Sequence, residues 1–344
     1  MGQVTILGAG TWGSALANVL AENGHQVTLW TRSQEQATEL EELRTNEHYL
    51  NDFHLHANVT ATSDLSLAVQ NAQIIGFVVP TKAIRQVALG VVEVLTTSSI
   101  ATPPLIFHAT KGIEQQTHLR VSEMLEDEFQ SVPYQGIVAL SGPSHAEEVA
   151  THHLTAITSA SKDEASAQVI QSLFMNQYLR VYTSTDIIGV ELGGALKNII
   201  GLCAGVSDGL NYGINTKAAL VTRGLAEITR LGVALGADPL TFSGLSGVGD
   251  LIVTTGSSLS RNWRCGYAIG QGVEPKQAIA ETGQIVEGVT TTNAAYELAK
   301  CHEVEMPITE AMYQVLNHHS DLRTIIANLM GRSMKSERVL PTNK

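Results

Sequence analysis

Residues 3–13 read Gln3-Val4-Thr5-Ile6-Leu7-Gly8-Ala9-Gly10-Thr11-Trp12-Gly13, the pattern of a strand, a glycine-rich turn and the start of a helix. Its first five residues form an apolar run typical of a buried strand, and the residues after Gly13 have the pattern of a helix. Three glycines fall in the turn between them, where they permit a tight bend and a close approach of the backbone to a ligand. The free N–H groups of the following helix attract an anion. The stretch therefore predicts a site for the pyrophosphate of a dinucleotide.

The first half of the chain continues this alternation of strands and helices. The predicted strands are rich in Val, Ile and Leu without strict alternation, as expected of strands buried on both faces. These strands are Gln3–Leu7, Gln26–Thr31, Ile74–Val79, Leu105–His108, Gly136–Leu140, Ala156–Ala160 and Tyr178–Tyr182. Helices are predicted between them at Trp12–Asn23, Thr81–Leu95 and Asp163–Phe174. The pattern predicts an α/β domain with a doubly wound, mostly parallel sheet.

After Tyr182 the pattern changes to long helices. We expect them at Asp186–Asp208, Thr216–Leu235, Thr290–Lys300 and Pro307–Leu316. The chain is thus predicted to form two domains, a dinucleotide-binding domain at 1–185 and an all-α substrate-binding domain at 186–344.

Charge and composition exclude several classes of function. The 344 residues carry 33 acidic against 21 basic side chains, so a net charge of −12 argues against nucleic acid and anionic membranes as partners. Three cysteines far apart favour a reducing compartment. The N-terminal residues have no signal-peptide pattern, and Lys197 interrupts the most apolar stretch, so we expect no membrane span. No His, Cys or acidic residues have metal-ligand spacing. A cytoplasmic protein without a metal is expected.

The end of the second predicted strand bears on the choice of cofactor. Sites selective for NAD place an acid there, about 20 residues after the glycine turn. Here Arg32 follows the strand and the first acid is Glu35. A guanidinium binds a 2′-phosphate bidentately, whereas a carboxylate repels it, so the sequence favours NADPH over NADH. The alternative is that Arg32 is only a solvated loop residue.

Lys197 stands alone in an apolar helical segment. It is the only charged residue between Glu191 and Asp208, and Gly193, Gly194 and Gly201 share its helix face. Three glycines on one face leave room for a ligand or for another backbone. Burial of the amine would lower its pKa and make the ammonium a better proton donor. Close helix packing with Lys197 reaching out to solvent is an equally good reading of this pattern.

Further cations and loops follow other strands. Lys111 comes after the strand that ends at His108, and the loop 141–146 follows another, at strand ends where α/β sheets collect ligands. The glycine-rich loop 244–250 ends in Asp250, and Ser260-Arg261-Asn262 lies downstream. An arginine beside backbone amides is a good phosphate clamp.

Taken in order, these segments resemble the bacterial NAD(P)-dependent glycerol-3-phosphate dehydrogenase family. The matching segments are Gly8–Gly13, His108–Gly112, Ser141–Ala146, Gly193–Ile199, Gly247–Leu251, Ser260–Asn262, Gln284–Gly288 and Glu305–Ile308. The likeness spans nearly the whole chain. Departures are small, chiefly Thr11 where Ser is frequent and the loop Gly256–Leu259.

The resemblance implies a Rossmann-like domain, a helical domain and a site between them. It implies reversible, NAD(P)H-dependent reduction of dihydroxyacetone phosphate to sn-glycerol 3-phosphate, which supplies phospholipid synthesis. Lys197 matches the family's proton-transfer lysine. The implied substrate-binding residues are Lys111, Gly142, Ser144, Lys197, Asp250, Thr254, Ser260, Arg261 and Asn262. The implied cofactor-binding residues are Gly8, Gly10, Thr11, Trp12, Gly13, Arg32, Tyr49, Lys111, Ala146, Arg261, Val286 and Glu287. A homodimer is a further expectation.

Two alternatives fit parts of the sequence. One is a dehydrogenase of the same architecture that acts on a β-hydroxyacid or a 2-keto acid, although the Ser260-Arg261-Asn262 phosphate clamp argues against it. The other is a dinucleotide-sensing protein without catalysis, which would need no buried lysine.

Overall fold

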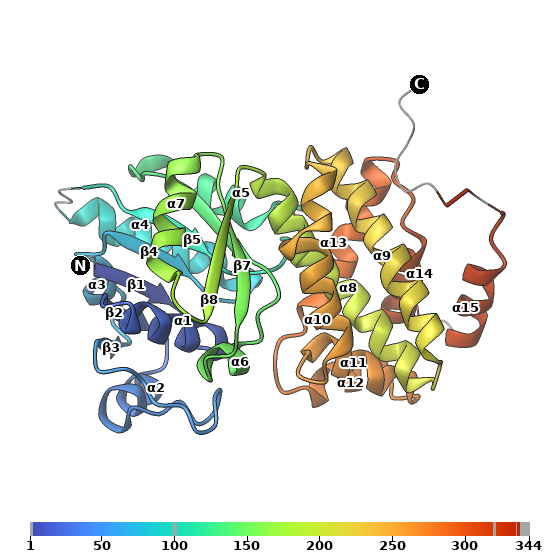
Figure 1. Cartoon of the computed structure of the whole chain (residues 1–344), viewed down its shortest axis with the longest axis horizontal. Helices are drawn as coiled ribbons and strands as arrows, with labels where there is room; N and C mark the ends of the chain where they lie inside the picture. The colour runs from blue at the N-terminus through green and yellow to red at the C-terminus, as the bar shows by residue number, and fades with distance from the viewer. Residues whose placement is uncertain (1–2, 99–101, 319–320, 335, 338–344) are drawn as a thin grey trace. The chain divides into compact units, whose positions relative to one another are not determined.

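A computed structural model describes residues 3–98, 102–318, 321–334 and 336–337, and the chain divides into two compact units (Figure 1). Unit 1 comprises Met1–Thr110 and Val121–Ile187, and unit 2 comprises Lys111–Arg120 and Ile188–Lys344. The predicted division placed the boundary at 185/186 in an unbroken chain, whereas in the structure the segment Lys111–Arg120 groups with unit 2.

Unit 1 is built on one eight-stranded sheet in the order β3-β2-β1-β4-β5-β6-β7-β8. The strands are β1 Gln3–Leu7, β2 Gln26–Trp30, β3 Val59–Thr62, β4 Ile74–Phe77, β5 Leu105–His108, β6 Ile137–Ser141, β7 Thr155–Ala160 and β8 Leu179–Ser184. Neighbouring strands pair in parallel except β6 with β7, which are antiparallel. The predicted α/β class and mostly parallel sheet are therefore confirmed.

The sequence missed β3. This strand reads Val-Thr-Ala-Thr, lies at the edge of the sheet and buries only its first residue fully. An edge strand with one partner needs no apolar run, so the signal that marked the central strands is absent. The remaining helical elements of unit 1 are α1 Thr11–Glu22, α2 Gln34–Thr38, η1 Glu39–Leu43, α3 Leu65–Val69, η2 Thr81–Ala83, α4 Ile84–Thr97, α5 Val121–Glu128, η3 Phe129–Ser131, α6 Ala146–Ala150 and α7 Glu164–Phe174.

Unit 2 is helical in the residues that the structure describes. Its elements are α8 Ile187–Gly209, α9 Ile214–Ala234, η4 Pro239–Ser243, η5 Leu245–Gly249, α10 Asp250–Gly256, α11 Arg261–Gly270, α12 Pro275–Glu281, α13 Glu287–Cys301, α14 Pro307–His318 and α15 Leu322–Met330. The four predicted long helices correspond to α8, α9, α13 and α14. The helices α10 and α12, of 7 residues each, span too few turns to show an apolar stripe, whereas α11 and α15 are amphipathic and were missed.

Helix α8 is the core helix of unit 2. By length and composition it could cross a membrane, so the expectation that Lys197 rules out any such segment was wrong. Of its apolar window 89% is buried inside the protein, and the core helices of soluble proteins meet the same criteria of length and composition.

Glycines on α8 let other backbones approach it. A methyl group at Gly193 would lie 2.3 Å from the Ser246 carbonyl oxygen, and one at Gly205 would lie 2.1 Å from the carbonyl oxygen of Trp263. A methyl group at Gly201 would meet Thr254 at 2.8 Å. The glycine-rich face of α8 is thus occupied by the η5 loop, α10 and α11, so the expected close packing is confirmed, whereas the expected exposure of Lys197 to solvent is wrong.

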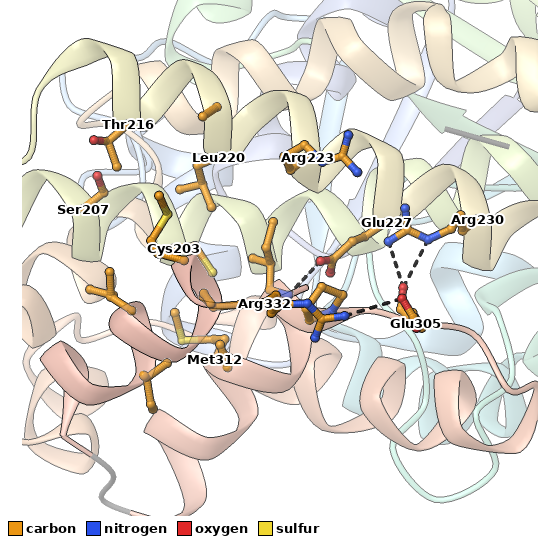
Figure 2. Close-up of a pocket in the computed structure, with 18 of the residues that line it drawn as sticks. Cys203, Ser207, Thr216, Leu220, Arg223, Glu227, Arg230, Glu305, Met312 and Arg332 are labelled. Carbon is orange, nitrogen blue, oxygen red and sulfur yellow. Dashed lines mark hydrogen bonds and ion pairs between the residues drawn. The ribbon is translucent and has the colours of Figure 1, made fainter. Parts of the chain in front are cut away.

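Unit 2 also contains a cavity of about 1190 Å³, lined mostly by aliphatic side chains of α8, α9, α14 and α15 (Figure 2). Glu227 of α9 is buried on its wall and accepts hydrogen bonds from the backbone N–H groups of Ile308 and Thr309, at 2.7 and 3.1 Å. These are among the first N–H groups of α14, so Glu227 caps that helix from another element. Arg230 and Arg332 both contact Glu305, as Figure 2 shows.

Candidate active site

The glycine turn of unit 1 joins β1 to α1. Gly8 has φ +118°, and a side chain there would lie 2.6 Å from the Val78 carbonyl oxygen. A methyl group at Gly13 would lie 1.8 Å from the Gly8 carbonyl oxygen. Gly10, the N-cap of α1, has open space where its side chain would be. Packing within the protein explains Gly8 and Gly13 but not Gly10, and open space before a helix N-terminus fits an approaching pyrophosphate.

Two side chains from the β2–β3 region hold this turn in place. The Ala9 carbonyl oxygen accepts hydrogen bonds from Gln36 Nε2 at 2.7 Å and from Asn46 Nδ2 at 3.0 Å. Thr11 Oγ1 donates to the Tyr49 carbonyl oxygen at 3.4 Å, so Tyr49 lies beside the turn. Trp12 is partly buried against the core of unit 1. The predicted residues Thr11, Trp12 and Tyr49 are thus brought together with the glycines.

Arg32 is exposed just after β2, and among the described residues its guanidinium has no hydrogen bond or ion pair. The acid nearest in sequence, Glu35, is exposed too, and its carboxylate accepts a hydrogen bond from Ser33 Oγ at 2.7 Å. That bond lowers the pKa of Glu35. The end of β2 therefore carries one exposed guanidinium, that of Arg32, and one carboxylate, that of Glu35, which a hydrogen bond holds in place.

The loop after β6 also belongs to unit 1. Gly142 has φ +144°, and its backbone lies so close to β7 that a side chain would meet the Ile157 Cα at 2.9 Å. Ser144 Oγ donates to the Gly142 carbonyl oxygen at 3.0 Å, and Ala146 is buried as the first residue of α6. These contacts explain the loop's shape without a ligand, so its roles in binding stay predictions.

In unit 2 the two predicted lysines meet on one carboxylate. Lys197 Nζ lies 2.5 Å from Asp250 Oδ1, and Lys111 Nζ lies 2.6 Å from Asp250 Oδ2. Lys197 Nζ also lies 2.7 Å from Thr254 Oγ1, one turn further along α10. Asp250 is 1% exposed and Lys197 8% exposed, so Lys197 does not reach out to solvent. Lys197, Lys111, Asp250 and Thr254 are called the lysine cluster below.

Burial sets the protonation chemistry of this cluster. It lowers the pKa of Lys197 to about 8, with the positive charge of Lys111 acting in the same direction and Asp250 opposing both. The desolvation of the amine thus outweighs even a 2.5 Å ion pair. An amine with this pKa is mostly an ammonium at neutral pH and releases its proton readily, as a general acid must.

One residue that the sequence analysis did not single out connects the predicted ones. Asn198 Nδ2 donates to the Lys111 carbonyl oxygen at 3.2 Å, and Asn198 Oδ1 accepts from Asn262 Nδ2 at 2.9 Å. Asn262 Oδ1 in turn accepts from the Gly288 N–H at 2.9 Å. In the sequence only its position next to Lys197 distinguishes Asn198, and that position does not show which way the side chain points.

The remaining predicted residues of unit 2 occupy helix starts. Ser260 is the N-cap of α11 and accepts from the Trp263 N–H, and Arg261 is the exposed first residue of that helix. Val286 is the buried N-cap of α13 and packs in the core of unit 2, with Glu287 next. Among the described residues no group of His, Cys, Asp and Glu side chains could hold a metal ion.

These features define a class of protein. A glycine turn suited to a pyrophosphate lies on a Rossmann-like sheet, and a buried ammonium suited to proton transfer lies on a helical unit. Hydride and proton transfer together are the chemistry of two-domain oxidoreductases that use a nicotinamide dinucleotide.

Comparison with known proteins identifies the family. Residues 3–167 match the N-terminal model of NAD-dependent glycerol-3-phosphate dehydrogenase, and residues 186–327 match its C-terminal model. The chain is 56% identical to glycerol-3-phosphate dehydrogenase [NAD(P)+] of Lactiplantibacillus plantarum, covering 98% of this chain and 99% of that one. It is 54% identical to the enzyme of the same description from Enterococcus faecalis, covering 97% of each. The crystal structure of glycerol-3-phosphate dehydrogenase from Coxiella burnetii is similar with TM-score 0.89 and 36% identity, over 96% of this chain and 99% of that one.

The chain belongs to the NAD-dependent glycerol-3-phosphate dehydrogenase family, and the resemblance inferred from its motifs is confirmed. It is an oxidoreductase that uses NAD(P).

Proposed function

We propose that this chain catalyses the reversible reduction of dihydroxyacetone phosphate to sn-glycerol 3-phosphate, which supplies glycerophospholipid synthesis. The observation that carries the proposal is the buried Lys197 ammonium on Asp250, with a second cation on the same carboxylate. Family membership of the whole chain supports the choice of substrate.

The glycine turn of unit 1 would hold the pyrophosphate of the nicotinamide cofactor, which would supply the hydride for the ketone carbon of the substrate. Lys197 acts on the oxygen, where its ammonium stabilises the growing negative charge and then gives up a proton. In the reverse direction the neutral amine takes the proton back. Asp250 and Thr254 hold the amine at its position and orient its protons, and exclusion of water strengthens each of these interactions.

Local cations make an acidic protein able to bind a doubly anionic substrate. We assign the substrate phosphate to Arg261 and Asn262, because Arg261 is exposed at the start of α11 and Asn262 retains one amide N–H beyond its bond to Asn198. Lys111 adds charge at the reacting end. Ser260, Gly142 and Ser144 complete the proposed substrate set.

For the cofactor, we assign the pyrophosphate to Gly8, Gly10 and Gly13 and the adenosine end to Arg32. The further proposed contacts are Thr11, Trp12, Tyr49, Lys111, Ala146, Arg261, Val286 and Glu287. The free guanidinium of Arg32 supports a preference for NADPH over NADH, and both remain substrates in the proposal.

We also propose a dinucleotide-binding domain at 1–185 and a substrate domain at 186–344, a cytoplasmic location, no membrane insertion and a homodimeric state. Light scattering on the purified protein tests the dimer.

One assay tests the function. NADPH oxidation is followed with dihydroxyacetone phosphate and repeated with NADH, with unphosphorylated dihydroxyacetone and a 2-keto acid as alternative substrates. We expect fast turnover of dihydroxyacetone phosphate, slow turnover of unphosphorylated dihydroxyacetone and none of the keto acid. Turnover of the keto acid instead would support a hydroxyacid dehydrogenase, and cofactor binding without ketone-dependent oxidation would support a dinucleotide sensor.

A further inference from the structure

The segment Lys111–Arg120 leaves unit 1 after β5 and returns to it at α5, and in between it is part of unit 2. It folds back on itself as a small hairpin. Ile113 and Arg120 form an antiparallel bridge, and the Glu114 N–H donates to the Leu119 carbonyl oxygen at 3.0 Å. Lys111 lies two residues before the bridge, so its position depends on how this hairpin is held.

Unit 2 holds the hairpin at several points. The Ile113 side chain is 2% exposed and packs in the core of unit 2, and the Lys111 carbonyl oxygen accepts from Asn198. At the far end Arg120 Nη1 bonds to Glu191 Oε2. Both partners are buried, at 8% and 7% exposed.

A buried ion pair at this place calls for an explanation beyond stability. Taking two charges out of water costs several kcal/mol per ion, which the pair only partly returns, so such pairs contribute more to geometry than to free energy of unfolding. Glu191 lies six residues before Lys197 on α8, about 9 Å along the helix axis. The pair thus fixes one strand of the hairpin to the helix that carries Lys197, while its other strand carries Lys111.

We infer that the Arg120–Glu191 pair is a positioning device that holds the Lys111 ammonium on Asp250, and that neither residue touches the substrate. This inference rests on the proposed function, in which Lys111 assists the reaction. The charges that act on the Lys197 amine are those of Asp250 and Lys111, and the Arg120–Glu191 pair adds no net charge. Its effect on the reaction therefore runs through the place of Lys111.

The test replaces both charges at once with the double variant Arg120→Met/Glu191→Leu, because removing one partner alone would leave a buried charge unpaired. We expect a folded protein whose kcat/KM for dihydroxyacetone phosphate falls about tenfold, within the range of coupling between neighbouring groups. The NADPH Kd should weaken by about twofold at most, because Lys111 is only one of several proposed cofactor contacts. Arg120→Lys with Glu191 intact should recover part of the loss.

Two further readouts separate positioning from a structural role. In a Lys111→Met background the double variant should cause little further loss, because the group it positions is gone. The alkaline limb of the reduction's pH profile should also move upward in both variants, because Lys111→Met removes the like charge beside Lys197 and the double variant displaces it. Lys217→Met, which breaks the ion pair with Asp208 elsewhere in unit 2, is the matched control and should leave the profile in place.

The outcomes are distinct. If Lys111→Met impairs turnover but the folded double variant has the parent kcat/KM, the inference is wrong and the proposed function stands. If the losses of the two variants simply multiply, the pair acts independently of Lys111 and the inference is wrong as well. If Lys111→Met itself has parent activity, the role given to Lys111 under the proposed function fails, and the inference fails with it.

Discussion

Lys197 Nζ and Asp250 Oδ1 lie 2.5 Å apart in the buried interior of unit 2, and yet the amine is easier to deprotonate than a free lysine. An ion pair alone would raise the pKa of the lysine. Burial and the charge of Lys111 reverse that effect and bring the pKa to about 8. The Lys197 amine is thus mostly protonated at neutral pH, and it loses its proton as the pH rises through about 8.

The pH dependence of turnover follows from this value. The reduction needs the ammonium, so its kcat should fall as pH rises through about 8. The oxidation needs the neutral amine, so its kcat should rise over the same range. Initial rates in both directions between about pH 6 and pH 10 measure this. If kcat for reduction and kcat for oxidation both rise or both fall with pH, another group transfers the proton.

Replacement of Lys197 by Met tests the proton donor itself. Methionine keeps the length and the apolar stem, and it removes a charge that costs free energy to bury, so the fold should persist. Loss of general-acid catalysis should reduce kcat about 10²–10⁴-fold. The NADPH Kd should stay close to that of the parent, because the glycine turn belongs to unit 1. If the variant keeps most of the parent kcat, Lys197 is not the proton donor, and Lys111 is the next candidate for that role.

Sequence reasoning found the parts of this site that have strong local signals. The glycine turn, the four long helices and the central strands could be predicted because each has a pattern within a dozen residues. The strand β3 could not, because an edge strand of threonines has no apolar run. The Arg120–Glu191 pair joins residues 71 positions apart, and nothing near Arg120 in the sequence marks it as buried. The charge of Glu191 near the start of the apolar helix α8 was the one available hint.

The two readings of the glycine-rich face of α8 each contained a part of the answer. The glycines admit the backbones of η5 and α11, as close packing requires. Lys197 nevertheless stays inside, because Asp250 sits at the junction of η5 and α10 and those packed elements carry it to the amine. The glycine pattern of one helix shows that another group packs closely against it, but it does not identify that group.

The choice between the two cofactors should depend on Arg32. Arg32→Asp replaces an unpaired guanidinium by a carboxylate beside Glu35, so a 2′-phosphate would meet two negative charges. NADPH binding should weaken far more than NADH binding, by at least about tenfold in the ratio of Kd values. Arg264→Ala, another exposed arginine, serves as the control for loss of charge. Equal losses for both cofactors would exclude a phosphate contact.

The substrate phosphate is tested at Arg261. Arg261→Ala should raise the KM for dihydroxyacetone phosphate about 10- to 100-fold, since a charge-assisted bond contributes about 1.5–3 kcal/mol. Unphosphorylated dihydroxyacetone has nothing for this guanidinium to bind, so its slow turnover should change little. Loss of both activities in the same proportion would mean that Arg261 does not contact the phosphate.

Glu227 should make the stability of unit 2 depend on pH. Burial raises the pKa of this carboxyl to about 7, against the opposing hydrogen bonds from Ile308 and Thr309. A carboxyl whose folded pKa exceeds its unfolded value favours the folded state at low pH. That contribution is complete below about pH 4.5 and is lost as pH rises through about 7.

Glu227→Gln should therefore flatten the pH dependence of the free energy of unfolding between about pH 4.5 and 7. The parent should lose about 3 kcal/mol over this range from the one group, an upper value for a shift of this size. Denaturant unfolding at several pH values measures it, with Glu281→Gln on the exposed face of α12 as the control for charge alone. The glutamine places an N–H group against the N–H donors of α14, so the variant should also be less stable at low pH, where the parent carboxyl is protonated. If the free energy of unfolding depends on pH in the variant as it does in the parent, Glu227 has the same pKa in the folded and the unfolded chain. Its hydrogen bonds to α14 would then offset the cost of burying its charge.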